Sequence, residues 1–85
     1  MSETSFLAIG FGNAVATARL IAVVGAEGAP VRRLIQDARE RGSLIDATSG
    51  KKTRAVLIMD SDHIVLSSLE PDELTARMTN GGGHE

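Results

Sequence analysis

The sequence predicts an α+β fold, in which a small, partly antiparallel sheet of four to five short strands packs with one main helix and a short C-terminal helix. Two kinds of segment support this prediction. Apolar runs of strand length recur along the chain, and a single longer segment has apolar residues at helical spacing. The helices carry too few apolar residues to close a core by themselves, so they are expected to pack on the sheet. The expected strands lie at residues 5–9, 20–24, 55–59 and 64–69, with a short strand or strand start at 44–46.

The first expected strand ends at Gly10-Phe11-Gly12-Asn13, where three of the four residues tolerate positive φ. A dinucleotide-binding fingerprint would require a third glycine where this chain has Val15, so we interpret the segment as a tight turn. Asn13 is a candidate for a hydrogen bond to the backbone or to a DNA phosphate. Residues 14–19 are ambiguous between strand and loop, and residues 20–24 are apolar on both faces, as in a central strand.

The main helix is expected over residues 30–41. Pro30 suits the first helical position, and Gly42 suits a left-handed stop. Its polar face carries four arginines, and Arg33–Asp37 and Asp37–Arg41 are spaced as i,i+4 ion pairs. This face could be solvated, form a subunit interface or face DNA. Arg32 has no acid three or four residues away, so we expect it to be available to a partner.

A basic loop, residues 48–54, connects residue 46 to the strand at 55–59. It places the cations Lys51, Lys52 and Arg54 within four residues. A P-loop would need glycine at Ile45 and a hydroxyl residue at Lys52, so that motif is excluded. Asp46, eight residues before Arg54, is expected to form a structural salt bridge with it.

Asp60, Asp62 and His63 form the one cluster with metal-like chemistry. They lie in the short polar segment 60–63 that would turn a hairpin, and adjacent turn residues point apart. A metal site needs at least three converging ligands, so turn residues without a metal are expected. No acid–base pair or activated nucleophile is visible at plausible spacing, and we do not expect an enzyme.

A second, short helix is expected to begin at Pro71, with Asp72 and Glu73 favouring its N-terminus and Leu74 and Met78 on its apolar edge. Residues 1–79 are expected to form a single domain, followed by a flexible glycine-rich tail at 80–85.

The composition favours association of this chain with itself. With 85 residues and no cysteine, the chain can bury only a modest core and cannot add a disulfide, so oligomerisation is the remaining route to stability. The net charge of −2 argues against nucleic acid, but residues 19–54 hold eight cations against four acids. No signal peptide or transmembrane run is visible, and a cytoplasmic location is expected.

The order of several segments resembles the small bacterial family of extracellular matrix regulatory protein A (RemA), over about residues 6–78. The segments are Ile9–Asn13, Ala29-Pro30, Ala38–Gly42, Ile45–Thr48, Gly50–Val56 and Ile58–His63. The resemblance implies a DNA-binding transcription regulator that forms homo-oligomeric rings, is associated with the nucleoid when bound to DNA, and uses no cofactor. Its partners would be double-stranded DNA and further copies of itself, with no membrane and no small-molecule substrate. The expected DNA-contacting residues are Arg19, Arg32, Lys51, Lys52 and Arg54, with Arg19 beside the loop cations.

One departure from the family matters for the mode of binding. The family typically has two arginines at Lys51-Lys52 and an aromatic residue at Ser49. Lysine keeps the attraction to phosphate but lacks the planar fork that reads guanine, so we expect backbone contacts from this pair. The main alternative is an oligomeric protein-interaction scaffold without nucleic-acid binding. Binding of a small anion or nucleotide in the Lys51–Arg54 loop is a third possibility.

Overall fold

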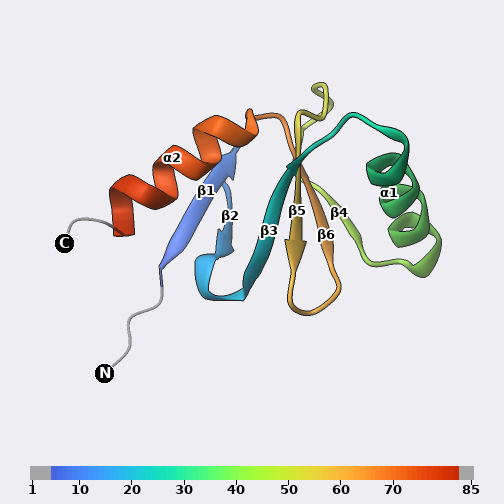
Figure 1. Cartoon of the computed structure of the whole chain (residues 1–85), viewed down its shortest axis with the longest axis horizontal. Coiled ribbons are helices and arrows are strands. Elements are labelled where there is room, and N and C mark those ends of the chain that lie inside the picture. Colours follow the sequence, from blue (N-terminus) through green and yellow to red (C-terminus); the bar gives the residue numbers. More distant parts are fainter. Residues whose placement is uncertain (1–4, 83–85) are drawn as a thin grey trace.

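The computed structural model describes the backbone of residues 5–82 and the side chains of residues 5–78. It confirms the α+β class, with six short strands, one 3-10 turn and two helices (Figure 1). The strands are β1 (Phe6–Gly10), β2 (Asn13–Ala16), β3 (Leu20–Gly25), β4 (Leu44–Asp46), β5 (Ala55–Met59) and β6 (Ile64–Ser67). The helices are α1 (Ala29–Arg41) and α2 (Pro71–Gly82), and the 3-10 turn covers Thr17–Arg19.

Four strands form the main sheet in the order β3-β5-β6-β4. β5 pairs antiparallel with both β3 and β6, and β4 runs parallel to β6 at the far edge. The hairpin between β5 and β6 is confirmed, because the amide of Asp62 donates to the carbonyl of Met59 and the amide of Met59 donates to that of His63. The central position of β5 explains its apolar run, since a strand with sheet on both sides and packing on both faces exposes almost nothing.

The side chains of β5 alternate between two apolar clusters, one on each face of the sheet. Val56 faces α1, where Ala38 of that helix is fully buried. Leu57 points to the other face, where it packs with Ile9 of β1 and Leu74 of α2. Figure 1 shows the same layering, with α1 on one side of the main sheet and the β1–β2 hairpin with α2 on the other.

Residues 14–19, which the sequence leaves ambiguous, divide into β2 and the 3-10 turn. Within residues 5–82, β2 pairs only with β1, so the strands described form two sheets and not one. The expected tight turn joins β1 to β2, but its positive φ values lie at Gly10, Phe11 and Gly12, and Asn13 instead begins β2. The buried Ser67 hydroxyl donates to the carbonyl of Ile9 at 2.9 Å and links the hairpin to the main sheet.

The helices begin close to the predicted positions. Gly42 ends α1 in the left-handed conformation, with φ of 78°. The expected Arg33–Asp37 and Asp37–Arg41 pairs are not among the ion pairs of residues 5–78, so that prediction is wrong for this conformation. α2 continues through residues 80–82, where a tail was expected, and the rest of that tail, 83–85, lies outside the described residues. Neither helix has the length and apolar character needed to cross a membrane.

Candidate nucleic-acid interface

The basic loop is fixed at its first end by Asp46 and Thr48. The Thr48 amide and hydroxyl both donate to Asp46 Oδ1, at 2.9 and 2.6 Å. The hydrogen bonds from the Thr48 hydroxyl and then from its amide hold the pKa of Asp46 below its ordinary value, because desolvation opposes them less strongly, and the charge of Arg39 adds the smallest lowering effect. Thr48 is itself only 2% exposed, so the loop starts from a buried, hydrogen-bonded residue.

A tight turn then exposes the two lysines. The Lys51 amide donates to the Thr48 carbonyl at 3.0 Å, and the two central residues, Ser49 and Gly50, have φ of 54° and 83°. Positive φ at both central positions is the pattern of a type I′ turn. Lys51 and Lys52 are exposed directly after it, and no hydrogen bond or ion pair within residues 5–78 engages either ammonium group.

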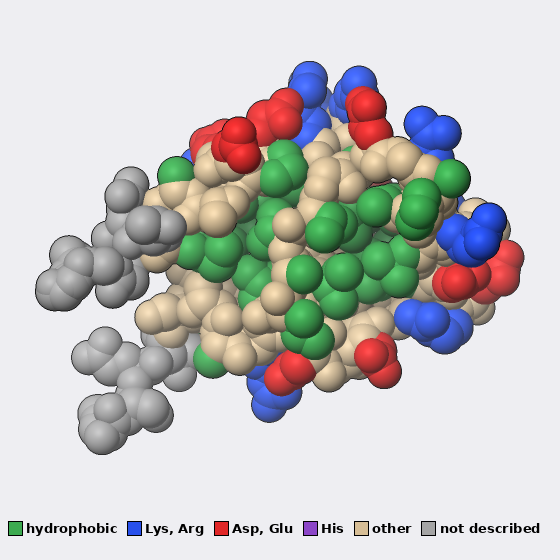
Figure 2. Space-filling view, in the orientation of Figure 1, with side chains coloured by type: hydrophobic (Ala, Val, Ile, Leu, Met, Phe, Trp, Pro, Cys, Tyr) green, Lys and Arg blue, Asp and Glu red, His purple; other side chains and the backbone are tan. Residues whose placement is uncertain are grey.

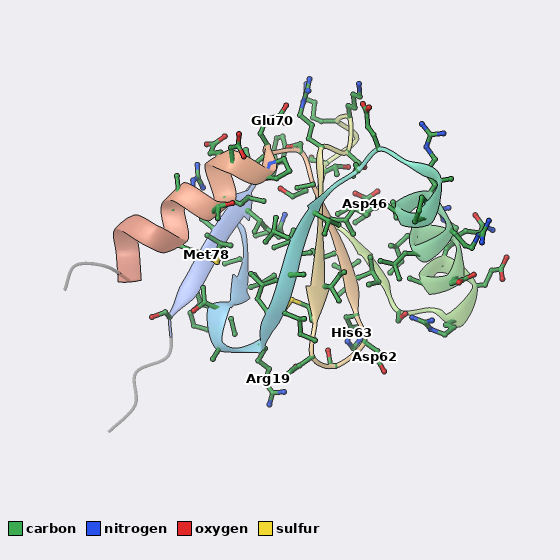
Figure 3. All side chains as sticks on the ribbon, in the orientation of Figure 1. Arg19, Asp46, Asp62, His63, Glu70 and Met78 are labelled. Carbon is green, nitrogen blue, oxygen red and sulfur yellow. The ribbon has the colours of Figure 1, made fainter. Side chains whose placement is uncertain are left out.

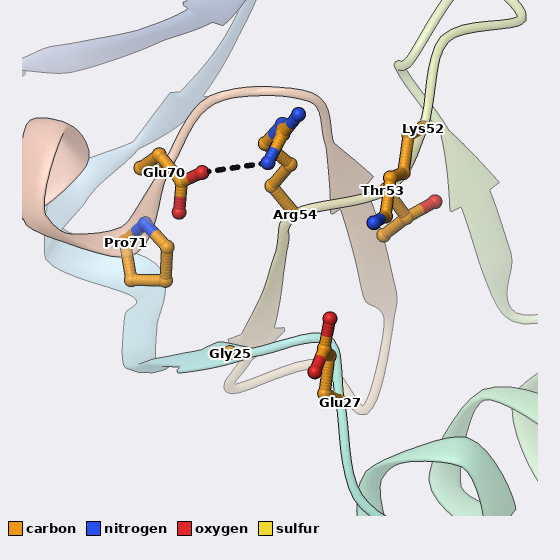
Figure 4. Close-up of a pocket in the computed structure, with 7 residues that line it drawn as sticks. All are labelled: Gly25, Glu27, Lys52, Thr53, Arg54, Glu70 and Pro71. Carbon is orange, nitrogen blue, oxygen red and sulfur yellow. Dashed lines mark hydrogen bonds and ion pairs between the residues drawn. The ribbon is translucent and has the colours of Figure 1, made fainter.

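Arg54 is held more firmly than the lysines. Its carbonyl accepts from the Ala26 amide, and its amide donates to the Ser67 carbonyl. Its guanidinium pairs with Glu70 Oε2 at 2.9 Å, as Figure 4 shows. The predicted Arg54–Asp46 salt bridge is therefore wrong, because Asp46 is engaged by Thr48 and Glu70 lies closer to Arg54.

A pocket of about 290 Å³ lies beside Arg54. It is lined by Gly25, Glu27, Lys52, Thr53, Arg54, Glu70 and Pro71 (Figure 4). Two cations are balanced by two carboxylates, so the pocket has no net positive charge to favour a small anion. The uncompensated charge of the loop lies outside it, on Lys51.

Arg19 lies at the other end of the sheet (Figure 3). It precedes Leu20, which pairs with Met59, whereas Arg54 precedes Ala55, which pairs with Gly25. The two arginines are thus separated by the length of β5, roughly 20 Å at the usual rise per residue. The expectation that Arg19 lies beside the loop cations is wrong within one chain. Because β3 and β5 run antiparallel, the residue before β3 and the residue before β5 lie at opposite ends of the sheet.

Arg19 also has an acidic partner of its own. It pairs with Asp60 at 3.3 Å, and the Asp60 amide donates to the Arg19 carbonyl at 2.8 Å. Both side chains are exposed, so the pair contributes little to stability, about 0–1 kcal/mol.

Arg32 lies in the first turn of α1 and is exposed. The Arg32 amide donates to the Gly28 carbonyl. Gly28 lies two residues after Ala26, whose amide donates to the Arg54 carbonyl. The first turn of α1, which contains Arg32, therefore lies at the same end of the sheet as the basic loop. Further along α1, Arg39 donates to Gln36 and Arg41 donates to Ser43.

The polar cluster at 60–63 behaves as turn residues. Asp62 has φ of 71°, and the Ser61 hydroxyl lies 2.7 Å from His63 Nδ1. In the part of the chain that the structure describes, no three acidic or histidine side chains converge as metal ligands would.

Comparison with known proteins identifies the family. The model of the RemA-like family, described as extracellular matrix regulatory protein A-like, matches residues 6–78. The chain belongs to the RemA-like family. Its relatives include a protein of Halothermothrix orenii, 54% identical over 82 residues, which covers 96% of this chain and 98% of that protein. Relatives from a Geobacillus species and from Clostridium kluyveri are each 55% identical, over 86% and 87% of this chain and 84% and 80% of their own lengths. All three are named as proposed regulatory proteins, in agreement with the description of the family as regulatory.

In this RemA-like chain, the structure adds two residues that sequence reasoning missed. Thr48 fixes the start of the basic loop, and Glu70 neutralises Arg54. Thr48 could have been found, because an acidic residue two positions before a threonine favours a local Asx-type turn. Glu70 lies sixteen residues from Arg54, and only the folded chain brings them together.

Proposed function

We propose that the chain is a DNA-binding transcription regulator that acts as a homo-oligomeric ring and contacts the DNA phosphate backbone through a repeated basic patch. The observation that carries this proposal is the exposed Lys51-Lys52 pair on a fixed type I′ turn, with no acidic partner among the described residues. Two exposed ammonium groups that no ion pair of the described residues engages suit a large polyanion. Membership of a family of regulators supports the same conclusion.

The ring explains how a chain with net charge −2 can hold DNA. Two or three cations per subunit bind phosphate weakly, but copies around a ring engage one duplex together, and linked weak contacts become avid. Asp60 is set apart from this contact at the other end of the sheet, whereas Glu27 and Glu70 line the pocket that Lys52 and Arg54 also line, so Lys51 carries the charge farthest from any acid of this pocket. A duplex curved along the ring would then be selected partly by its bendability.

The five cations contribute unequally. Lys51 and Lys52 make the main contacts with phosphate, and Arg32 supports them from the same end of the sheet. Arg54 must exchange Glu70 for phosphate before it can contribute. Arg19 forms a separate contact at the far end, where it must likewise leave Asp60.

Duplex binding measured by fluorescence anisotropy at low and moderate salt, with light scattering on the same sample, tests this function. We expect an oligomer whose affinity falls steeply with salt. The Lys51→Ala, Lys52→Ala double variant should keep its assembly, bind at least tenfold more weakly, and show a shallower salt dependence, by about 0.9 for each phosphate that the protein no longer neutralises.

The matched control is Arg39→Ala with Arg41→Ala, which removes the same charge from the end of α1. Equal reductions of affinity in both double variants would mean that general charge, and not the basic loop, attracts DNA. If the lysine variant dissociates into monomers, the lysines are interface residues and the site assignment fails.

One observation favours the alternative of an interaction scaffold without nucleic-acid binding. Arg19 and Arg54 are both neutralised by carboxylates within the same chain. An intact oligomer that binds no long duplex at low salt would establish this alternative and exclude DNA binding.

A further inference from the structure

β3 forms an open edge of the main sheet. Its sequence, Leu-Ile-Ala-Val-Val-Gly, pairs with β5 on one side, and no other strand of residues 5–82 joins its second side. Natural edge strands are usually protected by charged residues or proline, since unpaired backbone groups invite another strand. β3 has neither, so its edge is open to pairing.

A bulge presents an isoleucine at this edge. The pairs Leu20–Met59 and Ala22–Ile58 are consecutive, so two steps along β3 match one step along β5, and Ile21 is the extra residue. Bulges at sheet edges redirect a side chain out of the regular alternation. Ile21 is 66% exposed, which is unusual for a residue of a strand whose other side chains are mostly half-buried.

Apolar surface continues around this strand. In Figure 2, hydrophobic side chains cover the centre of the face where Figure 1 places β3, and charged side chains lie around its border. Arg19 and Asp60 lie beyond the start of β3, and Glu27 lies beyond its end. We call residues 20–24 and the apolar surface around them the β3 belt. An uncharged centre with a charged rim is typical of a protein–protein interface.

We propose that the β3 belt is the surface on which a second copy of this chain docks, through contacts centred on Ile21. The proposal rests on the oligomer of the proposed function and identifies the surface that forms it. A partner for the belt must itself be apolar, which excludes nucleic acid, and the mixed charges of the rim do not complement an anionic membrane. The chain itself offers such a partner surface, since Ile45 on the opposite sheet edge, β4, is 48% exposed.

The available area is sufficient for a stable contact. The molecule measures 39 × 23 × 22 Å, and Figure 2 views it down the shortest axis. A standard interface buries about 800 Å² per partner, which is comparable to one such face. Docking there would also add apolar burial to an 85-residue chain whose own core is modest.

The decisive variant is Ile21→Asp, because the exposed side chain contributes little to the core. We expect Ile21→Asp to be a monomer by light scattering, with an unchanged circular dichroism spectrum. Ala76→Asp, which adds the same charge at an exposed site of α2, should keep the wild-type mass. A wild-type mass for Ile21→Asp, or a monomeric wild-type protein, would overturn the proposal.

A second measurement covers the case in which Ile21→Asp does not fold. The chain has no cysteine, so a single introduced thiol reports its own accessibility. We expect Ile21→Cys in the assembled protein to react with a bulky maleimide at least tenfold more slowly than Ala76→Cys, and equal rates would overturn the proposal. Failure of DNA binding is a separate result, since an oligomer that Ile21→Asp dissociates supports the β3 belt even if no duplex binds.

Discussion

At the scale of single residues, the availability of a cation for DNA depends on its ion-pair partner as well as on its position in the sequence. Lys51 and Arg54 lie three residues apart, yet only Arg54 is neutralised, by the Glu70 carboxylate at 2.9 Å. Both side chains of that pair are about half exposed, so the interaction is weak enough for a phosphate to replace it. The affinity of the proposed basic patch for phosphate therefore depends on Glu70, an acid that itself makes no proposed contact with DNA.

We predict that Glu70→Gln strengthens DNA binding. Releasing Arg54 from a surface pair worth about 0–1 kcal/mol should tighten each contact by up to about fivefold, and the salt dependence should steepen. Anisotropy titrations at two salt concentrations measure both effects. Glu73→Gln is the matched control, because it removes the same charge from an acid that pairs with Arg77. Equal gains in the two variants would assign the effect to net charge and leave Arg54 without a role.

At the scale of elements, the basic loop depends on its type I′ turn. Gly50 has φ of 83°, and a Cβ atom there would meet nothing within 4 Å. Gly42, which ends α1, is alike in both respects, with φ of 78°. Alanine at either position would be strained by its backbone conformation alone, at a cost of about 1–2 kcal/mol.

We predict that Gly50→Ala and Gly42→Ala lower the free energy of unfolding by similar amounts, while only Gly50→Ala weakens DNA binding. The reason is that the turn positions Lys51 and Lys52, whereas the end of α1 positions no proposed contact. Denaturant unfolding and anisotropy on the same samples separate the two effects. If both variants weaken binding equally, general loss of stability is the cause and the turn has no specific role.

The same elements show what the sequence could and could not predict. The β5–β6 hairpin, the Gly42 stop and the turn at Gly10–Asn13 follow from local chemistry, because turn residues carry their own backbone preferences. The separation of β1 and β2 into their own sheet does not, since pairing depends on which apolar faces meet in the folded chain. The Arg54–Glu70 pair was missed for the same reason. The position of Arg19 could have been inferred once β3 and β5 were taken as antiparallel neighbours.

At the scale of the whole molecule, the five candidate DNA-contacting cations lie toward two ends of one sheet. The basic loop and the start of α1 lie at one end, and Arg19 lies at the other, with the β3 belt between them. Under the proposed function, a subunit would touch DNA at two separate places, and the apolar surface between them would meet its neighbour. The two proposals thus place DNA contacts at the charged ends and the subunit contact in the uncharged middle.

The two ends make a quantitative prediction about the wild-type oligomer. We expect Arg19→Ala to weaken duplex binding less than Lys51→Ala with Lys52→Ala, because Arg19 must first leave Asp60. The two reductions in binding free energy should add within about 0.3–0.5 kcal/mol in the triple variant, since sites more than about 10 Å apart rarely interact. Light scattering on each variant must show the wild-type mass, so that affinity is compared between equal assemblies. If Arg19→Ala leaves both the affinity and the salt dependence unchanged, Arg19 serves only its pair with Asp60, and contact with DNA is confined to the basic-loop end.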